Sequence, residues 1–157
     1  MNDRFSTWLR SMSNVRLGAI LLFASFAVNA PLVFFAELPL ISGTDAGPNE
    51  MMQSMSIGTR LFYGSIVVPL FETALFQLGP VLLLRRLLRV RWALVILASA
   101  TLFAAGHMYS GQYMAFAFLV GLVFAYGFSI RDDQVDRAFV LVAVVHGLRN
   151  AVVSLIF

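Results

Sequence analysis

Five apolar runs, each close to the ~20 residues that a helix needs to cross a bilayer, constrain this chain more than any other feature. A closed β-barrel is the only other structure that spans a membrane, and it is built from alternating strands of about ten residues. These runs are instead continuous and rich in Leu, Ala, Val and Phe. The sequence therefore predicts an all-α protein, a polytopic membrane helical bundle of five transmembrane helices in a single membrane domain over residues 1–157. The approximate spans are 17–36, 61–84, 92–109, 113–130 and 138–157.

Composition supports a lipid environment over water. Of the 157 residues, 60% are hydrophobic and 12% are charged, whereas an average soluble domain is about 45–50% apolar and about 25% charged. So few charges cannot cover the surface of a soluble fold, and the expected main partner is the lipid bilayer. The net charge of +3 does not indicate nucleic-acid binding, because the Arg residues are few and most lie at the ends of apolar runs. The absence of Cys excludes disulfides and thiolate chemistry.

Arginine positions predict the orientation of the chain. Cytoplasmic loops carry an excess of Lys and Arg over external loops. The N-terminal arm holds three Arg residues, the 85–91 connection holds four and the 131–137 connection holds two, whereas the 42–59 and 110–112 connections hold none. The sequence therefore predicts that the N-terminus lies inside the cell and the C-terminus outside.

Four strongly polar residues within the spans predict a site: Glu72, His107, His146 and Asn150. Such groups are costly in hydrocarbon and mark function or internal pairing by default. His146 and Asn150 are four residues apart and share one helix face, and we expect all four residues around one small wet cavity. Counted at about 1.5 Å per residue from the inner ends, His107 lies nearer the outer face than His146, so tilt or a kink near Pro69 must bring them together.

A purely structural interpretation of these residues also exists. A single His in a membrane helix is as readily a hydrogen-bond donor between helices as a catalyst. The combination of two His with Glu72 and Asn150 favours a functional site. Arg149, beside Asn150, is expected to have a structural role in pairing with an acid, with substrate binding as the alternative.

Three short motifs resemble those of the CPBP intramembrane proteases, a family also called Abi or CAAX prenyl protease 2-like. Residues 69–77, Pro-Leu-Phe-Glu-Thr-Ala-Leu-Phe-Gln, resemble its first motif, which has a Pro, two adjacent Glu and then Phe-Arg. Residues 103–107, Phe-Ala-Ala-Gly-His, resemble the second, Phe-x-x-x-His. Residues 146–150, His-Gly-Leu-Arg-Asn, resemble the third, His-x-x-x-Asn. The motifs occur in the family order, each in its own predicted span.

The resemblance implies an intramembrane endopeptidase of a bacterial inner membrane that hydrolyses a peptide bond in a membrane-associated protein or peptide. In the family's scheme Glu72 is the general base and holds water together with His107. His146 and Asn150 donate hydrogen bonds to the oxyanion of the tetrahedral intermediate. No cofactor is expected. Zn²⁺ is the alternative, because Glu72, His107 and His146 could bind it and leave a fourth position for water.

Two departures from the first motif raise other possibilities. Thr73 occupies the position of the second Glu, and Gln77 that of the Arg. These changes favour, as an alternative, a catalytically inactive relative that binds a membrane peptide, for instance a bacteriocin immunity protein. A third possibility is a small transporter subunit that uses Glu72 and the two His as a proton relay, although the chain lacks the repeats of such transporters.

Overall fold

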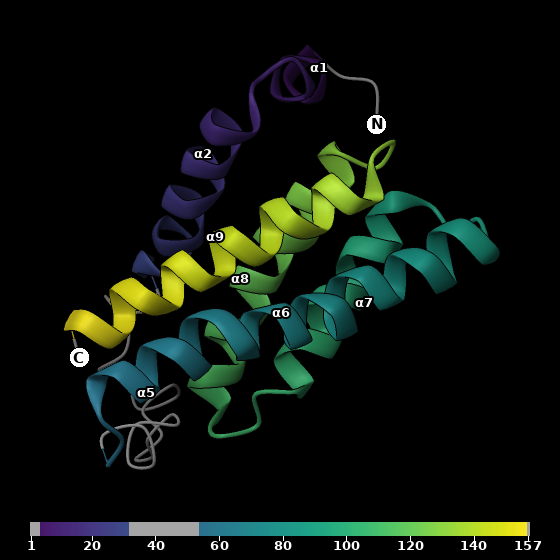
Figure 1. The fold of residues 1–157 in the computed structure, drawn as a ribbon. Helices are drawn as coiled ribbons and strands as arrows, with labels where there is room; N and C mark the ends of the chain where they lie inside the picture. The colour runs from purple at the N-terminus through teal and green to yellow at the C-terminus, as the bar shows by residue number, and fades with distance from the viewer. Residues whose placement is uncertain (1–3, 32–53, 157) are drawn as a thin grey trace.

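The structure, a computed structural model, describes residues 4–31 and 54–156, and every regular element in these ranges is helical (Figure 1). The all-α prediction is therefore confirmed. Residues 32–36 of the first predicted span, residue 157 of the last and most of the 42–59 connection lie outside the described residues. The helices, with η marking π-helical stretches, are α1 (Arg4–Arg10), α2 (Asn14–Ala27), α5 (Ile57–Phe62), η1 (Tyr63–Val67), α6 (Val68–Glu72), η2 (Thr73–Leu78), η3 (Val81–Leu87), α7 (Trp92–Ala105), α8 (Gly111–Ile130) and α9 (Val135–Ile156).

Three of the described helices are long and apolar enough to cross a membrane: Ile57–Leu87, Gly111–Ile130 and Val135–Ile156. The first of these, called the long helix below, joins α5, η1, α6, η2 and η3. Two shorter apolar helices, α2 and α7, have 14 residues each; α2 overlaps the first predicted span, and α7 lies within the third. The chain is thus a multi-pass membrane protein, and three of its five predicted spans correspond to helices long enough to cross a membrane.

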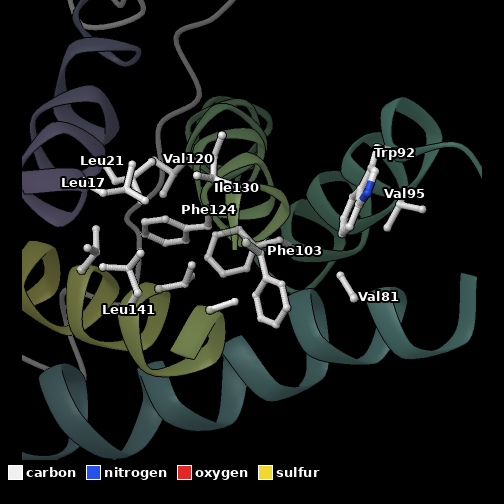
Figure 2. Close-up of a cluster of buried hydrophobic side chains, with 14 of the residues drawn as sticks. Leu17, Leu21, Val81, Trp92, Val95, Phe103, Val120, Phe124, Ile130 and Leu141 are labelled. Carbon is white, nitrogen blue, oxygen red and sulfur yellow. The ribbon is translucent and has the colours of Figure 1, made fainter. Parts of the chain in front are cut away.

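Packing places α9 at the centre of the bundle. It contacts α2, α8 and the long helix, while α7 and α8 form a hairpin beside it (Figure 1). Phe103, Phe124 and Leu141 belong to the buried apolar cluster between these helices (Figure 2). At Gly121 on α8, an added Cβ would lie 3.0 Å from the Cα of Ala100 on α7, so glycine allows the two backbones to approach closely.

The outer faces of the same helices are apolar too. Large apolar side chains there are exposed, with Phe71 at 68% and Val140 at 58%. An exposed apolar surface of this kind would be unfavourable in water and fits a lipid surround. By contrast, none of the four predicted site residues, Glu72, His107, His146 and Asn150, is exposed.

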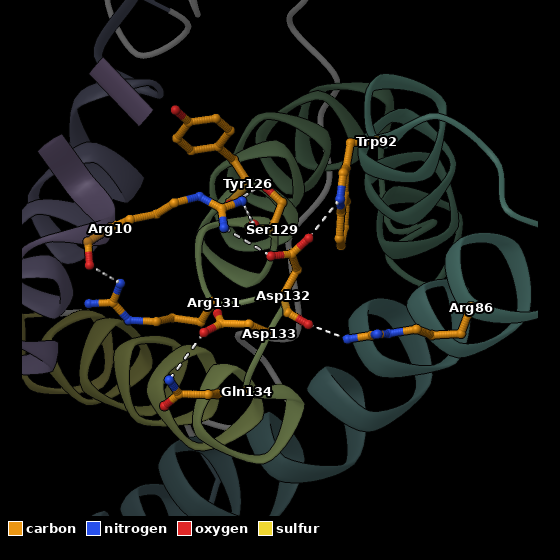
Figure 3. Close-up of polar contacts among 9 residues, drawn as sticks. All are labelled: Arg10, Arg86, Trp92, Tyr126, Ser129, Arg131, Asp132, Asp133 and Gln134. Carbon is orange, nitrogen blue, oxygen red and sulfur yellow. Dashed lines mark hydrogen bonds and ion pairs between the residues drawn. The ribbon is translucent and has the colours of Figure 1, made fainter. Parts of the chain in front are cut away.

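One end of the bundle is strongly polar (Figure 3). Asp132, in the α8–α9 connection, accepts hydrogen bonds from Arg10 Nη1 at 3.1 Å and from Trp92 Nε1 at 3.1 Å, while its backbone carbonyl accepts from Arg86. The segments that the Arg count predicts to lie inside the cell meet at this end, which we call the arginine end. Nine of the eleven Arg residues lie on these segments.

Candidate functional site

Glu72 ends α6, in the middle of the long helix, between two π-helical stretches. A π-helical turn contains one more residue than an α-helical turn and often occurs at functional sites. The Val68 N–H donates to the Tyr63 carbonyl, five residues earlier. In this register the carbonyl of Gly64 would face the nitrogen of Pro69, which carries no hydrogen. The local sequence thus leaves one backbone carbonyl of η1 available for another partner.

Asn150 on α9 is that partner. Its Nδ2 donates a hydrogen bond to the Gly64 carbonyl oxygen at 2.9 Å. Three residues earlier, Gly147 lies against the carbonyl of Ser65, so closely that an added Cβ would overlap the carbonyl oxygen. The predicted polar face of α9 therefore docks onto η1, which fixes how α9 is rotated against the long helix. The second N–H of the Asn150 amide makes no hydrogen bond to another described residue.

His107 lies in the turn that follows α7. Its Nδ1 is 2.6 Å from the carbonyl oxygen of Phe103, one helical turn earlier. Because a carbonyl oxygen can only accept, Nδ1 carries the hydrogen and Nε2 of the neutral ring is an acceptor. Nε2 is 3.6 Å from Oε1 of Glu72. Gly106 allows the end of α7 to lie close to the long helix, because an added Cβ there would lie 2.7 Å from Cζ of Phe76 on η2.

His146 approaches Glu72 from another helix. Its Nε2 lies 3.4 Å from Oε2, so each oxygen of the one carboxylate faces an imidazole nitrogen. His146 is 3% exposed and packs against the rings of Phe124, at 4.8 Å between centroids, and Phe103, at 5.6 Å. Three helices thus bring Glu72, His107 and His146 together, while Asn150 contacts η1, eight residues before Glu72.

Tyr113 is a further site residue that sequence reasoning missed. Its ring stacks on the ring of His107, with centroids 5.8 Å apart and planes 26° apart. The position is set by the start of α8, where the Ser110 hydroxyl caps the helix by accepting from the Tyr113 N–H at 3.1 Å. Ser-Gly-Gln-Tyr three residues after His107 would have been a usable signal, because a turn between two helices can bring the first ring of the second helix back toward a His at the end of the first.

Arg149 lies beside this site without a counter-charge. Its guanidinium carbon is 5.4 Å from the centroid of the Phe26 ring on α2, a cation–π distance. Its buried Nε has no hydrogen-bond partner, and it forms no ion pair with any residue in 4–31 or 54–156. The contact with α2 fits the structural role predicted for it, although the ion pair with an acid is not found among these residues.

Thr73 and Gln77, the two departures from the first motif, are both fully buried at 0% exposure. The Thr73 hydroxyl and both polar atoms of the Gln77 amide have no hydrogen-bond partner. Where the first motif of the resembled family has a Glu and an Arg, this chain has two neutral side chains that do not bond to each other, in a place where unpaired polar groups are costly.

Metal binding was the alternative use of the same residues. Among the described residues, no group of three or more His, Asp or Glu side chains has the mutual placement of a metal site. The nearest candidate is Glu72 with His107 and His146, whose Nε2 atoms face different carboxylate oxygens.

Comparison with known proteins places the chain in a family. The family model described as type II CAAX prenyl endopeptidase Rce1-like matches residues 55–152, more than half of the sequence, and this range contains all three motifs. No curated protein and no solved structure gives a significant match. The predicted resemblance is confirmed: the chain belongs to the Rce1-like family of type II CAAX prenyl endopeptidases.

Proposed function

We propose that this protein is an intramembrane endopeptidase that hydrolyses a peptide bond in a membrane-associated protein or peptide. One observation carries the proposal: a single partly buried carboxylate, Glu72, has one oxygen 3.6 Å from His107 Nε2 and the other 3.4 Å from His146 Nε2. Structural hydrogen bonding alone would need only one histidine on this carboxylate. Membership of a family of CAAX prenyl endopeptidases supports the same reaction class.

His107 and Glu72 are suited to holding the attacking water. The Nδ1 hydrogen of His107 is committed to Phe103, so Nε2 and Oε1 face each other as two acceptors at 3.6 Å. A water that donates one hydrogen to each acceptor satisfies both and turns a lone pair toward the substrate. As its oxygen bonds to the peptide carbonyl carbon, one proton passes to Glu72. Glu72 then returns that proton to the leaving amine nitrogen when the C–N bond breaks.

His146 and Asn150 are the proposed oxyanion donors. With Nε2 protonated, His146 donates toward Oε2 of Glu72 in the resting site and can turn this hydrogen to a developing oxyanion. Asn150 uses one N–H on the Gly64 carbonyl and keeps the second for the substrate. The bond to Gly64 also holds the amide in place before substrate binds, which is the preorganisation that such donors require.

Newly formed N- and C-termini of membrane proteins provide the test of this proposal. Membrane fractions from cells that express the wild-type chain, or its Glu72→Gln variant, are compared by mass spectrometry of newly formed peptide ends. Ends that appear only with the wild-type chain identify both the activity and its substrate. Their absence at equal amounts of membrane-inserted protein would remove the protease assignment.

We propose that the protein sits in a bacterial inner membrane with its N-terminus inside and its C-terminus outside. Because the chain has no Cys, single Cys residues report their own side of the membrane. Gly111, where an added Cβ meets nothing within 4 Å, starts α8 at the end opposite the arginine end, and Asp133 is exposed at the arginine end. In intact spheroplasts an impermeant maleimide should label Gly111→Cys, and it should label Asp133→Cys only after permeabilisation. The reverse labelling pattern would show that the N-terminus lies outside the cell.

We propose hydrolysis without a metal. The mechanism above uses only Glu72, the two His and Asn150, and Asn is a poor zinc ligand. Purified protein is expected to contain well under one Zn²⁺ per chain, and 1,10-phenanthroline should leave cleavage unchanged. Activity that a chelator removes and Zn²⁺ restores would replace this scheme with the zinc alternative.

One observation favours a second candidate, an inactive relative that binds a membrane peptide, as a bacteriocin immunity protein does. The buried Thr73 and Gln77 leave polar atoms unpaired where the family motif has charged residues. A protein of this kind would protect or bind without Glu72-dependent cleavage. Equal protection by the wild-type and Glu72→Gln chains would support it.

A further inference from the structure

A cleft at the arginine end is separate from the candidate active site. It has a volume of about 390 Å³ and lies where the α1–α2 turn, the end of α8 and the start of α9 meet. This volume is within the range of small-molecule sites, roughly 300–1,000 Å³. Its lining is Arg10, Met12, Ser13, Asn14, Ile130, Arg131, Asp133, Gln134 and Arg137.

Arg131 gives this cleft a fixed cationic wall. The residue is 8% exposed, and its guanidinium donates to Asn14 Oδ1 at 3.1 Å, to the Arg10 carbonyl at 2.9 Å and to the Met12 carbonyl at 2.5 Å. All three acceptors are neutral, so they orient the guanidinium without cancelling its charge. The same bonds clamp the α1–α2 turn onto the α8–α9 connection (Figure 3 shows Arg131 and Arg10). The cleft is therefore preformed.

The remaining groups add to the positive charge. Arg137 is exposed and makes no hydrogen bond or ion pair with another described residue, while Arg10 is paired with Asp132 at 3.1 Å. Three Arg residues against Asp133 alone leave the lining with a formal charge of 3 − 1 = +2. Helices α2 and α9 both begin at the cleft, so their N-terminal N–H groups point toward it and favour an anion.

We propose that this cleft binds the phosphate of an anionic phospholipid headgroup. Guanidinium groups match phosphate oxygens with paired hydrogen bonds. The cleft lies at the ends of apolar helices that are long enough to cross a membrane, and lipid headgroups meet such helices at their ends. The positive-inside rule explains why Arg residues are concentrated at this end. It does not explain why three of them surround one cleft, nor why one is buried and held by three hydrogen bonds.

Lipid retention tests the proposal. The full-length protein is released from nanodiscs of phosphatidylglycerol and phosphatidylcholine, and native mass spectrometry counts the lipids that stay bound. The wild-type chain is expected to retain one phosphatidylglycerol in preference to phosphatidylcholine, whose ammonium group the Arg residues repel. Arg137→Gln should weaken this retention about tenfold, since it removes charge-assisted hydrogen bonds. Asp133→Asn should strengthen it.

Arg91→Gln is the matched control, because Arg91 is an exposed Arg at the same end, outside the cleft. It removes the same charge and should leave retention unchanged. An equal loss in both Arg variants would mean general attraction to an anionic surface and would overturn the site. Binding of inorganic phosphate by the wild-type chain without any preference for phosphatidylglycerol over phosphatidylcholine would identify free phosphate, not a lipid, as the ligand. Equal retention of both lipids by the wild-type chain would also refute the proposal.

Discussion

Glu72→Gln is expected to reduce cleavage by about 10²–10⁴-fold, the usual contribution of a general base. Gln has nearly the same shape as Glu, so it should fill the same space between His107 and His146. It cannot take a proton from water, and its NH₂ group would face at least one imidazole nitrogen where a carboxylate oxygen now lies. The amount of protein in the membrane should therefore stay close to that of the wild type, while new peptide ends disappear from the membrane fraction.

Asp136→Asn is the control for this experiment. Asp136 is exposed in the first turn of α9, at the arginine end, and the change removes one negative charge as Glu72→Gln does. We expect its cleavage to equal that of the wild type. If Glu72→Gln keeps more than a tenth of the wild-type rate, Glu72 is not the base, and the carboxylate between the two His has a structural role.

Gly147→Ala is expected to have the largest effect on stability. The added methyl group would overlap the carbonyl oxygen of Ser65, and neither backbone can move away without separating α9 from η1. Overpacking of this kind costs about 1–3 kcal/mol. Separation would also draw Asn150 from Gly64 and His146 from Glu72, so we expect both a lower midpoint of thermal unfolding in detergent and weaker cleavage.

Gly58→Ala provides the comparison. Gly58 lies in the first turn of α5, where an added Cβ meets nothing within 4 Å. There the same substitution should raise helix stability slightly, by about 0.5–1 kcal/mol at most. Equal unfolding midpoints for the two variants would contradict the close approach of α9 and the long helix.

The membrane character and the approach of Glu72, His107 and His146 could be predicted from the sequence, because both depend on what lipid cannot satisfy. Continuous apolar runs can cross a bilayer only as helices. Burying Glu72, His107 and His146 in a membrane costs free energy unless these side chains contact one another. The expected obstacle, the greater depth of His107, does not prevent their meeting. Both His side chains lie near the Glu72 carboxylate, each facing a different oxygen.

What the sequence did not predict depends on backbone geometry. The π-helical register around Pro69 follows from tertiary packing, so the bond from Asn150 to Gly64 could not be foreseen from spacing. Tyr113 was predicted only as the start of a span. Hydropathy does not indicate that the turn before α8 would bring its ring against His107. The cleft at Arg131 joins residues more than 100 positions apart, which no local pattern connects.

The number of residues between Gly64 in η1 and Glu72 at the end of α6 sets the geometry of the active site. Gly64 contacts Asn150, and Glu72, which faces His146, lies five residues beyond the end of η1. Deleting one residue from α6 between them, such as Leu70, would rotate Glu72 by about 100° relative to Gly64. The carboxylate would then leave the two imidazoles although every catalytic residue is still present. Loss of function in such a chain would come from length alone, whereas exchanges among the exposed apolar side chains of η1, such as Ile66, should matter little.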